Sequence, residues 1–189
     1  MHDLAMGAVG SKADADGTKT YADLVVEGLK EHDVEIVTAL PESLLIDVYR
    51  KVAADPAFIY VQAASEQDLP GVVAGAYLAG KRSVMFMENS GLREACEPIA
   101  RLIFGHRMPM VMVMPHRGDL GEYNWWGHGH SLTMEPLLKA LGIPHWPVRK
   151  LEEIKPSIKR ALIHADAGQT AVALIFGGDC VEVPHYAKD

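Results

Sequence analysis

Acidic, amide, hydroxyl and imidazole side chains gather at four corners where a short apolar segment gives way to a polar turn. The four corners are Pro41 to Ser43, Ala64 to Glu66, Glu88 to Gly91 and His116 to His130. Glu66 is the most informative residue among them, because a carboxyl group at the start of a helix can exchange a proton with a bound cofactor. The types and spacing of these residues predict proton-transfer chemistry at a site that several segments build together.

Ordinary helix-start chemistry is the alternative for three of these corners. Ser65 could cap a helix, with Asp68 completing a capping box and the positive end of the helix dipole favouring the acids. Pro41 to Ser43 could be a strand end followed by a capping serine, and Asn89 to Gly91 could be an N-cap with a glycine that lets two backbones approach. The local sequence leaves both interpretations open.

The fourth corner is predicted to be a long polar loop, Pro115 to His130, that is dense in chemically active side chains. These side chains are His116, Arg117, Asp119, Glu122, Trp125, Trp126, His128 and His130. Arg117 offers a fork for a carboxylate, sulfonate or phosphonate, and a histidine here could shuttle protons. A solvated loop position is the alternative for His116 and His128. Three histidines could hold zinc or copper, but no cysteine or carboxylate spacing completes a recognised pattern, so no metal ligand is predicted.

Buried and amphipathic patterns alternate beyond residue 18, as in a parallel sheet with helices on both faces. The predicted strands are Glu35 to Leu40, Phe58 to Gln62, Ser83 to Met87, Pro109 to Met114, His145 to Val148 and Thr170 to Phe176. The predicted helices run from about Tyr21 to His32, Pro41 to Ala53, Glu66 onward, Gly91 to Phe104, Leu132 to Leu141 and Leu151 to Ala165. These elements predict an α/β fold, a single doubly wound domain with a six-stranded, mostly parallel sheet. Because ligands bind beyond the carboxyl ends of the strands in such sheets, the four corners should meet at one edge.

Methionines alternate along the fourth predicted strand, at Met108, Met110, Met112 and Met114. Thioethers at this spacing could bind soft copper, but methionine more commonly fills irregular gaps in an apolar core. The strand is apolar on both faces, as a central parallel strand should be. We therefore predict that these side chains are buried.

Composition and charge limit the classes of function. A chain of 189 residues is long enough for one domain, and a formal charge of -7 without a block of Lys or Arg argues against nucleic acid or an anionic membrane as partner. Cys96 and Cys180 are too few for a disulfide framework, which indicates a reducing compartment. No apolar run approaches the ~20 residues of a membrane-spanning helix, and residues 1–18 lack the pattern of a secretory signal. We therefore predict a cytoplasmic protein with a flexible N-terminal arm over residues 1–18.

Taken in order, the corners resemble the pyrimidine-binding domain of thiamine diphosphate enzymes, most closely the sulfopyruvate and phosphonopyruvate decarboxylases. The resemblance rests on Leu40 to Leu45, Ser65-Glu66 with Ala74, Gly75 and Gly80, Glu88 to Leu92 with Pro98, and Arg117 to Glu122 followed by Leu141 to Ile143. It implies the thiamine diphosphate-binding fold and covers residues 19–189, which we expect to form one pyrimidine-binding domain. The chain departs from the family at Arg93-Glu94, where the relatives tend to continue with Gly-Asn.

The resemblance implies a role for each corner. Glu66 would hydrogen-bond the N1' atom of the cofactor's aminopyrimidine and move the proton that activates the thiazolium carbon for attack on a 2-oxo acid. The residues expected beside Glu66 are Pro41, Glu42, Asn89, Ser90 and Gly91 for the cofactor ring, Ser43, Arg117 and His128 for the substrate, and His116 for proton transfer. Glu66 and His116 are therefore the expected catalytic residues.

The second half of a thiamine diphosphate site is missing from the sequence. In the family, Gly-Asp-Gly and an Asn roughly thirty residues later hold Mg²⁺ and the diphosphate. The near match Gly177 to Cys180 lies too close to the end of the chain to be followed by such an Asn. The resemblance therefore implies an alpha subunit, a separate beta subunit that holds the diphosphate and Mg²⁺, and an assembly of at least α2β2.

The expected activity is that of a thiamine diphosphate-dependent 2-oxo acid decarboxylase, a carboxy-lyase of the sulfopyruvate or phosphonopyruvate type. Another 2-oxo acid as substrate, and carboligation in place of decarboxylation, stay open. A non-catalytic α/β binding or regulatory module is the rival interpretation. A metal-dependent hydrolase built on the histidines of the fourth corner is the third.

Overall fold

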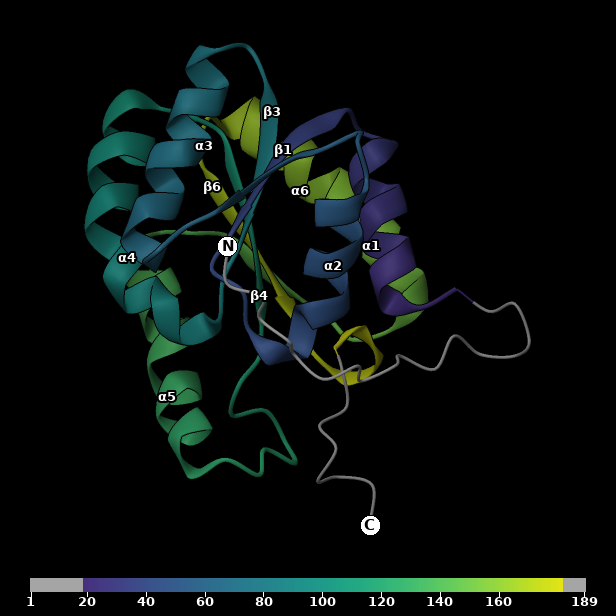
Figure 1. Ribbon diagram of the computed structural model, residues 1–189. Helices are drawn as coiled ribbons and strands as arrows, with labels where there is room; N and C mark the ends of the chain where they lie inside the picture. The colour runs from purple at the N-terminus through teal and green to yellow at the C-terminus, as the bar shows by residue number, and fades with distance from the viewer. Residues whose placement is uncertain (1–18, 182–189) are drawn as a thin grey trace.

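Six parallel strands form the sheet in the computed structural model, which describes residues 19–181 (Figure 1). The strands are β1 (Val34–Ala39), β2 (Ile59–Gln62), β3 (Arg82–Phe86), β4 (Met110–Pro115), β5 (His145–Val148) and β6 (Ala171–Phe176). They lie in the order β2-β1-β3-β4-β6-β5, and each neighbouring pair is parallel. β4 and β6 are buried along their whole length, as central strands covered on both faces should be. The predicted doubly wound α/β fold is confirmed.

Helices cover both faces of this sheet and bury a separate apolar cluster on each (Figure 1). One face carries α1 (Tyr21–Lys30), α2 (Ile46–Ala54) and α6 (Ile154–Gly168). The other carries α3 (Leu69–Leu78), α4 (Leu92–Pro98), the π-helical turn η4 (Ile99–Phe104) and α5 (Trp125–Ala140). The alternating methionines of β4 all pack into this second cluster. Their predicted role in the core is therefore confirmed.

Short 3-10 turns stand between the strands and most of the helices that follow. They are η1 (Ser43–Leu45), η2 (Glu66–Asp68), η3 (Asn89–Gly91) and η5 (Leu151–Glu153), with η6 (Gly178–Cys180) after the last strand. Three of the four predicted corners are such turns, and they precede α2, α3 and α4. The corners follow β1, β2, β3 and β4, which are neighbours in the sheet. All four therefore lie at the same edge, as predicted.

The fourth corner is shorter than the sequence indicated. The predicted loop from Pro115 to His130 is wrong at its end, because α5 begins at Trp125 and not near Leu132. Two glycines and two tryptophans are weak helix formers, so the first turns of α5 carry no helical signal. Tertiary contacts hold this corner instead: the Glu122 carboxylate accepts from the backbone N–H of Gly118 at 3.1 Å and of Asn124 at 2.9 Å, and it lies where a Cβ at Gly127 would approach it to 2.8 Å. His128 and His130 therefore belong to a helix.

Residues at both ends of the chain lie outside the part that the structure describes. The predicted flexible arm, residues 1–18, lies outside the described residues, as do residues 182–189. Within residues 19–181, none of the helices is both long enough and apolar enough to span a bilayer.

Gly118→Ala should destabilise the protein more than Gly121→Ala. Both glycines have φ near +90°, at +87° and +93°, so a side chain strains the backbone by about 1–2 kcal/mol at either position. At Gly118 the new Cβ would also collide with the Gly127 carbonyl oxygen, whereas at Gly121 nothing lies within 4 Å. Overpacking of this kind costs about 1–3 kcal/mol more. Urea denaturation measures both variants, and equal destabilisation would contradict the packing of this loop on α5.

Candidate functional site

Three of the four corners touch one another through Arg117, the second residue after β4, and the Glu66 side chain joins them beside Gly91. The Arg117 guanidinium donates to the Ser43 hydroxyl at 2.5 Å, and its backbone carbonyl accepts from the Asn89 amide at 2.9 Å. His130 on α5 lies 3.5 Å from the Glu88 carboxylate, so α5 also reaches the corner after β3. The sequence is therefore right that these corners form one constellation.

Arg117 is buried among carboxylates of its own chain. The residue is 4% exposed, and its guanidinium lies 3.9 Å from Glu42, 3.5 Å from Glu88 and 3.9 Å from Glu122. The Trp126 ring covers it, with 5.1 Å between the guanidinium carbon and the ring centroid. An arginine so enclosed is poorly placed to receive a substrate anion, because its charge is already neutralised. Arg117 instead holds the corners together.

Glu42 caps the turn after β1, in place of the Ser43 cap that the local interpretation expected. Its carboxylate accepts hydrogen bonds from the backbone N–H of Leu44 at 2.7 Å and of Leu45 at 2.6 Å. Burial raises the pKa of Glu42 to about 7, although these two donors and the Arg117 charge lower it. Burial therefore outweighs the donors, and Glu42 exchanges its proton near neutral pH.

Glu66 is half-buried at the first position of η2, and its side chain fills the space beside Gly91. A Cβ on Gly91 would collide with Glu66 Cγ and lie 2.5 Å from Oε1, so only glycine leaves room for this carboxyl group. Burial raises the pKa of Glu66, and the charges of Glu94 and Glu88 raise it further, against its own backbone N–H and Arg93. The corner after β2 thus presents the Glu66 carboxyl group, which binds a proton more tightly than an ordinary glutamate does.

The helix start at this corner is built differently from the predicted capping box. The Ser65 hydroxyl accepts from the backbone N–H of Gln67 at 3.4 Å and donates to Glu94 at 2.8 Å. Asp68 takes no part in a side-chain cap, since it begins α3 without such a bond. The cap at this corner therefore does not use the Glu66 carboxyl group.

Asn89 and Ser90 also differ from the N-caps that the local sequence allowed. Asn89 is 1% exposed; its amide nitrogen donates to Arg117, and its Oδ1 has no hydrogen-bond partner within residues 19–181. The Ser90 hydroxyl donates to Glu88 at 2.8 Å. A buried amide oxygen without a donor is costly, and such an atom is a natural acceptor for a ligand.

The structure separates the three histidines of the fourth corner. His116 faces away from the other corners, with its Nε2 3.0 Å from the Ser131 hydroxyl and its Nδ1 3.9 Å from Asp119. His128 is exposed on α5. His130 meets Glu88, lies 3.1 Å from an Arg93 nitrogen and packs on Trp126 at 5.3 Å between centroids.

Burial lowers the pKa of both partly buried histidines. For His116 the neighbouring Asp119 opposes this effect, and for His130 the Glu88 charge does. Both rings are therefore mainly neutral at pH 7. A neutral imidazole can accept a proton and pass it on.

Sequence reasoning missed Glu88, Glu122, Arg93, Trp126 and His130 as members of the candidate site. Glu88 is the first residue of a predicted corner, so its position at the site could be predicted from the end of β3 alone. Trp126 and His130 are four residues apart, a spacing that puts both on one helix face, but only once this segment is known to be helical. Arg93 lies where the chain departs from the family pattern, and this departure could have pointed to it.

No group of three or more His, Cys, Asp and Glu side chains is arranged to hold a metal ion within residues 19–181. The histidines considered as an alternative zinc or copper site illustrate this. His116 and His130 have different neighbours, and His128 is exposed.

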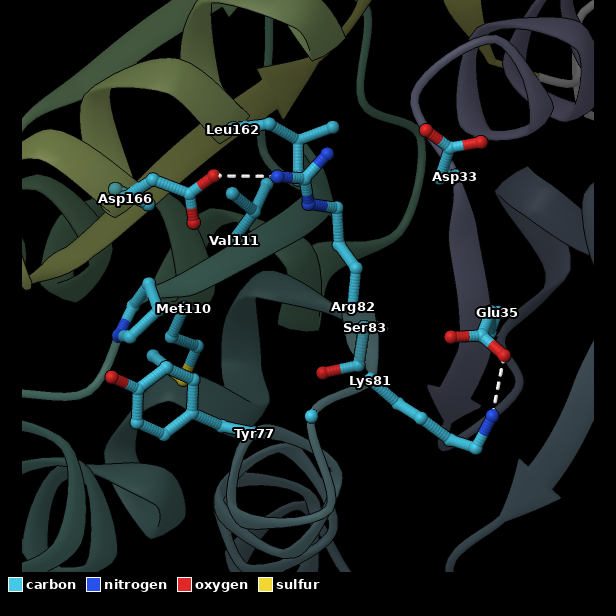
Figure 2. A pocket seen from close by; sticks show the side chains of 13 residues that line it. Asp33, Glu35, Tyr77, Lys81, Arg82, Ser83, Met110, Val111, Leu162 and Asp166 are labelled. Atoms are coloured by element: carbon cyan, nitrogen blue, oxygen red, sulfur yellow. Dashed lines mark hydrogen bonds and ion pairs between the residues drawn. The ribbon is translucent and has the colours of Figure 1, made fainter.

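A pocket of about 420 Å³ lies at the opposite edge of the sheet, where β1, β3 and β4 begin (Figure 2). Four of its five charged side chains are paired with one another: Arg82 lies 2.8 Å from Asp166, and Lys81 binds Glu35. The corners contribute no residue to it. This pocket is therefore separate from the candidate site.

No protein-family model matches the chain. It is 30% identical over 152 residues to the sulfopyruvate decarboxylase subunit alpha of Methanocaldococcus jannaschii, and the match covers 80% of this chain and 90% of the relative. It is 31% identical over 137 residues to the protein of the same name from Methanothermobacter thermautotrophicus, covering 72% and 83%.

Two longer proteins match only in part. The phosphonopyruvate decarboxylase of Streptomyces viridochromogenes is 36% identical over 101 residues, which are 53% of this chain and 25% of that protein. A solved structure of 2-oxoglutarate:ferredoxin oxidoreductase from Magnetococcus marinus shares the fold with a TM-score of 0.66 and 22% identity. The match covers 86% of this chain and spans 30% of the oxidoreductase chain.

Glu42→Gln should make the stability of the protein less dependent on pH. Between the usual Glu value of 4.5 and about 7, the folded protein holds a proton on Glu42 that the unfolded chain has released. The wild-type free energy of unfolding should therefore fall as the pH rises through this window, by up to about 3 kcal/mol. Glutamine does not titrate, so the variant should lack this part of the slope.

Urea denaturation at about pH 5 and about pH 8 measures the difference between wild type and Glu42→Gln. Glu97→Gln is the control, because Glu97 is exposed and pairs with Arg101. Equal pH dependence in all three proteins would show that Glu42 is ionised throughout.

Proposed function

Because the chain belongs to the family of sulfopyruvate decarboxylase alpha subunits, we propose that it is the pyrimidine-binding subunit of a thiamine diphosphate-dependent 2-oxo acid decarboxylase. Such an enzyme is a carboxy-lyase. The observation that carries the proposal is the Glu66 carboxyl group, which has a raised pKa and lies in the space left by Gly91. A non-catalytic module would have no use for this arrangement.

The residues of the site fit the aminopyrimidine end of thiamine diphosphate. The Glu66 carboxyl group suits a ring nitrogen that must exchange a proton, and the buried, unpartnered Asn89 Oδ1 suits an amino group that needs an acceptor. When bound, the cofactor supplies the electron sink for the loss of carbon dioxide. Glu66 holds and moves the proton at the N1' atom, a contribution of about 10²- to 10⁴-fold in rate.

The other corner residues position these two groups. Arg117 ties Ser43 to the corner that carries Asn89, and Glu42 fixes the turn after β1. Pro41 and Ser90 complete the walls of the cofactor site in this proposal. A shift of a single corner would move Glu66 or Asn89 relative to the cofactor, and small misplacements of catalytic groups are costly.

A histidine is still needed to pass a proton to the carbon that loses carbon dioxide. His130 fits this role best, because it alone among the three candidate histidines contacts a carboxylate of another corner, at 3.5 Å from Glu88. His116 faces Asp119 and Ser131 instead, and His128 is exposed. We therefore move the proton-transfer role that the sequence gave to His116 onto His130.

Arg93 replaces Arg117 in our proposal as the cation for a second substrate anion. Its guanidinium donates to the Thr133 hydroxyl at 2.8 Å and lies beside His130, and its charge lowers the pKa of Glu66. Unlike Arg117, it is exposed and faces no carboxylate at ion-pair distance within residues 19–181. A sulfonate or phosphonate could reach it next to the catalytic carboxyl group.

A partner subunit completes the enzyme in this proposal. The relatives' name, subunit alpha, implies a second kind of subunit. We propose that a beta subunit holds the diphosphate and Mg²⁺, that the active site lies between the two chains, and that the assembly is α2β2 or larger.

Glu66→Gln, mixed with the partner subunit, should decarboxylate about 10²- to 10⁴-fold more slowly while it still assembles. Glutamine preserves the shape of the side chain but cannot exchange the proton. Carbon dioxide release measures activity, and size-exclusion chromatography measures assembly. Glu97→Gln serves as the control on an exposed position and should retain full activity. Turnover by Glu66→Gln at near the wild-type rate would refute the assignment.

Arg93→Ala should raise KM for sulfopyruvate and phosphonopyruvate by about tenfold or more, and leave KM for 2-oxo acids with one anion nearly unchanged. Removing one charge-assisted hydrogen bond to the substrate accounts for this magnitude. Carbon dioxide release over such a panel, with the aldehyde or carboligation product identified, also names the substrate and the reaction. Arg101→Ala is the control, since Arg101 is exposed and pairs with Glu97. An equal rise for all substrates would contradict the role of Arg93.

A further inference from the structure

Four large apolar side chains stand in solvent at one end of the domain, on the loop before α5 and on its outer side. Leu120 is 100% exposed, Tyr123 71%, Trp125 84% and Leu132 77%. We call these residues, together with Gly129, the α5 surface. Soluble proteins expose single apolar residues freely, but several large ones close together along the chain mark an interaction site.

The helical part of this surface follows the spacing of a buried helix face. Trp125, Gly129 and Leu132 are at positions i, i+4 and i+7, which share one side of a helix. The opposite side of α5 already packs on the sheet through Met134 and Leu138. The outer side of α5 thus carries two large apolar side chains, Trp125 and Leu132, that the domain itself leaves in solvent.

Other exposed apolar residues in the described part of the chain do not form such a face. Ile59, Trp146 and Ile163 lie one each on β2, β5 and α6; α3 carries Leu78 and the less exposed Tyr77, which lines the pocket at the opposite edge. Isolated positions of this kind need no partner. The α5 surface differs from them because its members share one helix and the loop that leads into it.

The α5 surface adjoins the candidate site. Trp126, beside Trp125, covers the Arg117 guanidinium, and His130, beside Gly129, contacts Glu88. Figure 1 shows α5 and the preceding loop projecting past the body of the domain at the edge where the corners lie. A protein that covers the α5 surface would also lie against the corners and exclude water from them.

We propose that the α5 surface is the docking site for the diphosphate-binding subunit, an inference that rests on the proposed function. Two observations favour this occupant. Glu66 and Arg93 are still partly or fully exposed, so the site needs a second protein to shield it. In the phosphonopyruvate decarboxylases, the matched region is about a quarter of a longer chain, whereas the sulfopyruvate decarboxylase alpha subunits match over most of their length. What the longer chains carry beyond the match, a separate subunit can supply here.

The size of the surface suits a stable complex. A specific interface buries about 800 Å² on each partner, and an aromatic side chain alone buries about 150–250 Å². Trp125 and Tyr123, with two leucines, can therefore form the apolar centre of such an interface. The chemistry expected of the partner is an apolar recess that accepts the Trp125 indole, because tryptophan is among the most frequent energetic anchors of interfaces.

Trp125→Ser and Leu132→Ser should each weaken binding of the partner subunit by about tenfold or more, measured by calorimetric titration. Leu78→Ser is the matched control, because Leu78 is a helical leucine with 76% exposure against 77% for Leu132. It should bind as wild type does. All three side chains are mainly in solvent, so circular dichroism should show unchanged folding. The partner used is the chain that bears Gly-Asp-Gly and the later Asn.

Hydrogen exchange gives a second readout that needs no substitution. Amides of residues 118–124 should exchange more slowly in the complex than in the free chain. Wild-type affinity of both α5 variants, or unchanged exchange, would overturn the proposal. So would a dimer of this chain alone that Trp125→Ser dissociates while the partner still binds, because the surface would then belong to a second copy.

These outcomes are separable from failure of the proposed function. If the complex forms and Trp125→Ser weakens it but Glu66→Gln stays active, the docking site stands and the catalytic assignment falls. If Glu66→Gln is inactive and the α5 variants bind normally, the reverse holds. If wild type and partner do not associate at all, both are refuted.

Discussion

The guanidinium of Arg117 lies 3.5–3.9 Å from three carboxylates, and the arrangement of the site depends on this buried charge. One cation cannot neutralise three acids, and burying unpaired charge is costly. The excess is relieved where Glu42 takes up a proton near neutral pH and where Ser90 donates to Glu88. The three carboxylates come from the turns after β1, β3 and β4. Their shared attraction to the Arg117 guanidinium therefore fixes these turns relative to one another.

Most of the fold could be predicted from the sequence, because strand burial and helix amphipathicity are local patterns. The start of α5 could not: Gly127 and Gly129 carry no helical signal, and contacts with Glu122 form the first turn. The same limit applies within the site. Glu66 stands out from its neighbours alone, but Ser43 lies 74 positions from Arg117, and no spacing rule connects the two residues.

The surroundings of Glu66 favour one of the two interpretations that the sequence left open. Capping at its corner falls to Ser65, so the carboxyl group is not needed by the helix. Gly91 gives it space, and burial with nearby acids strengthens its hold on a proton. A helix-start glutamate would instead be ionised and stabilised by the dipole. Glu42 caps its turn although its pKa is raised as well, so the raised pKa of Glu66 supports a proton carrier only together with the Ser65 cap that leaves this carboxyl group spare.

The edge that carries the corners is incomplete in three ways, whereas the opposite edge is not. Asn89 Oδ1 lacks a donor within residues 19–181, Glu66 is only half-buried, and Trp125 stands in solvent. At the other edge, both cations of the pocket in Figure 2 are paired with carboxylates: Lys81 with Glu35 and Arg82 with Asp166. A small ligand could satisfy Asn89 but could not cover Trp125, and a protein partner could cover Trp125 without supplying a donor to Asn89. The proposed function meets both deficits together, because it places the cofactor between this chain and a second one.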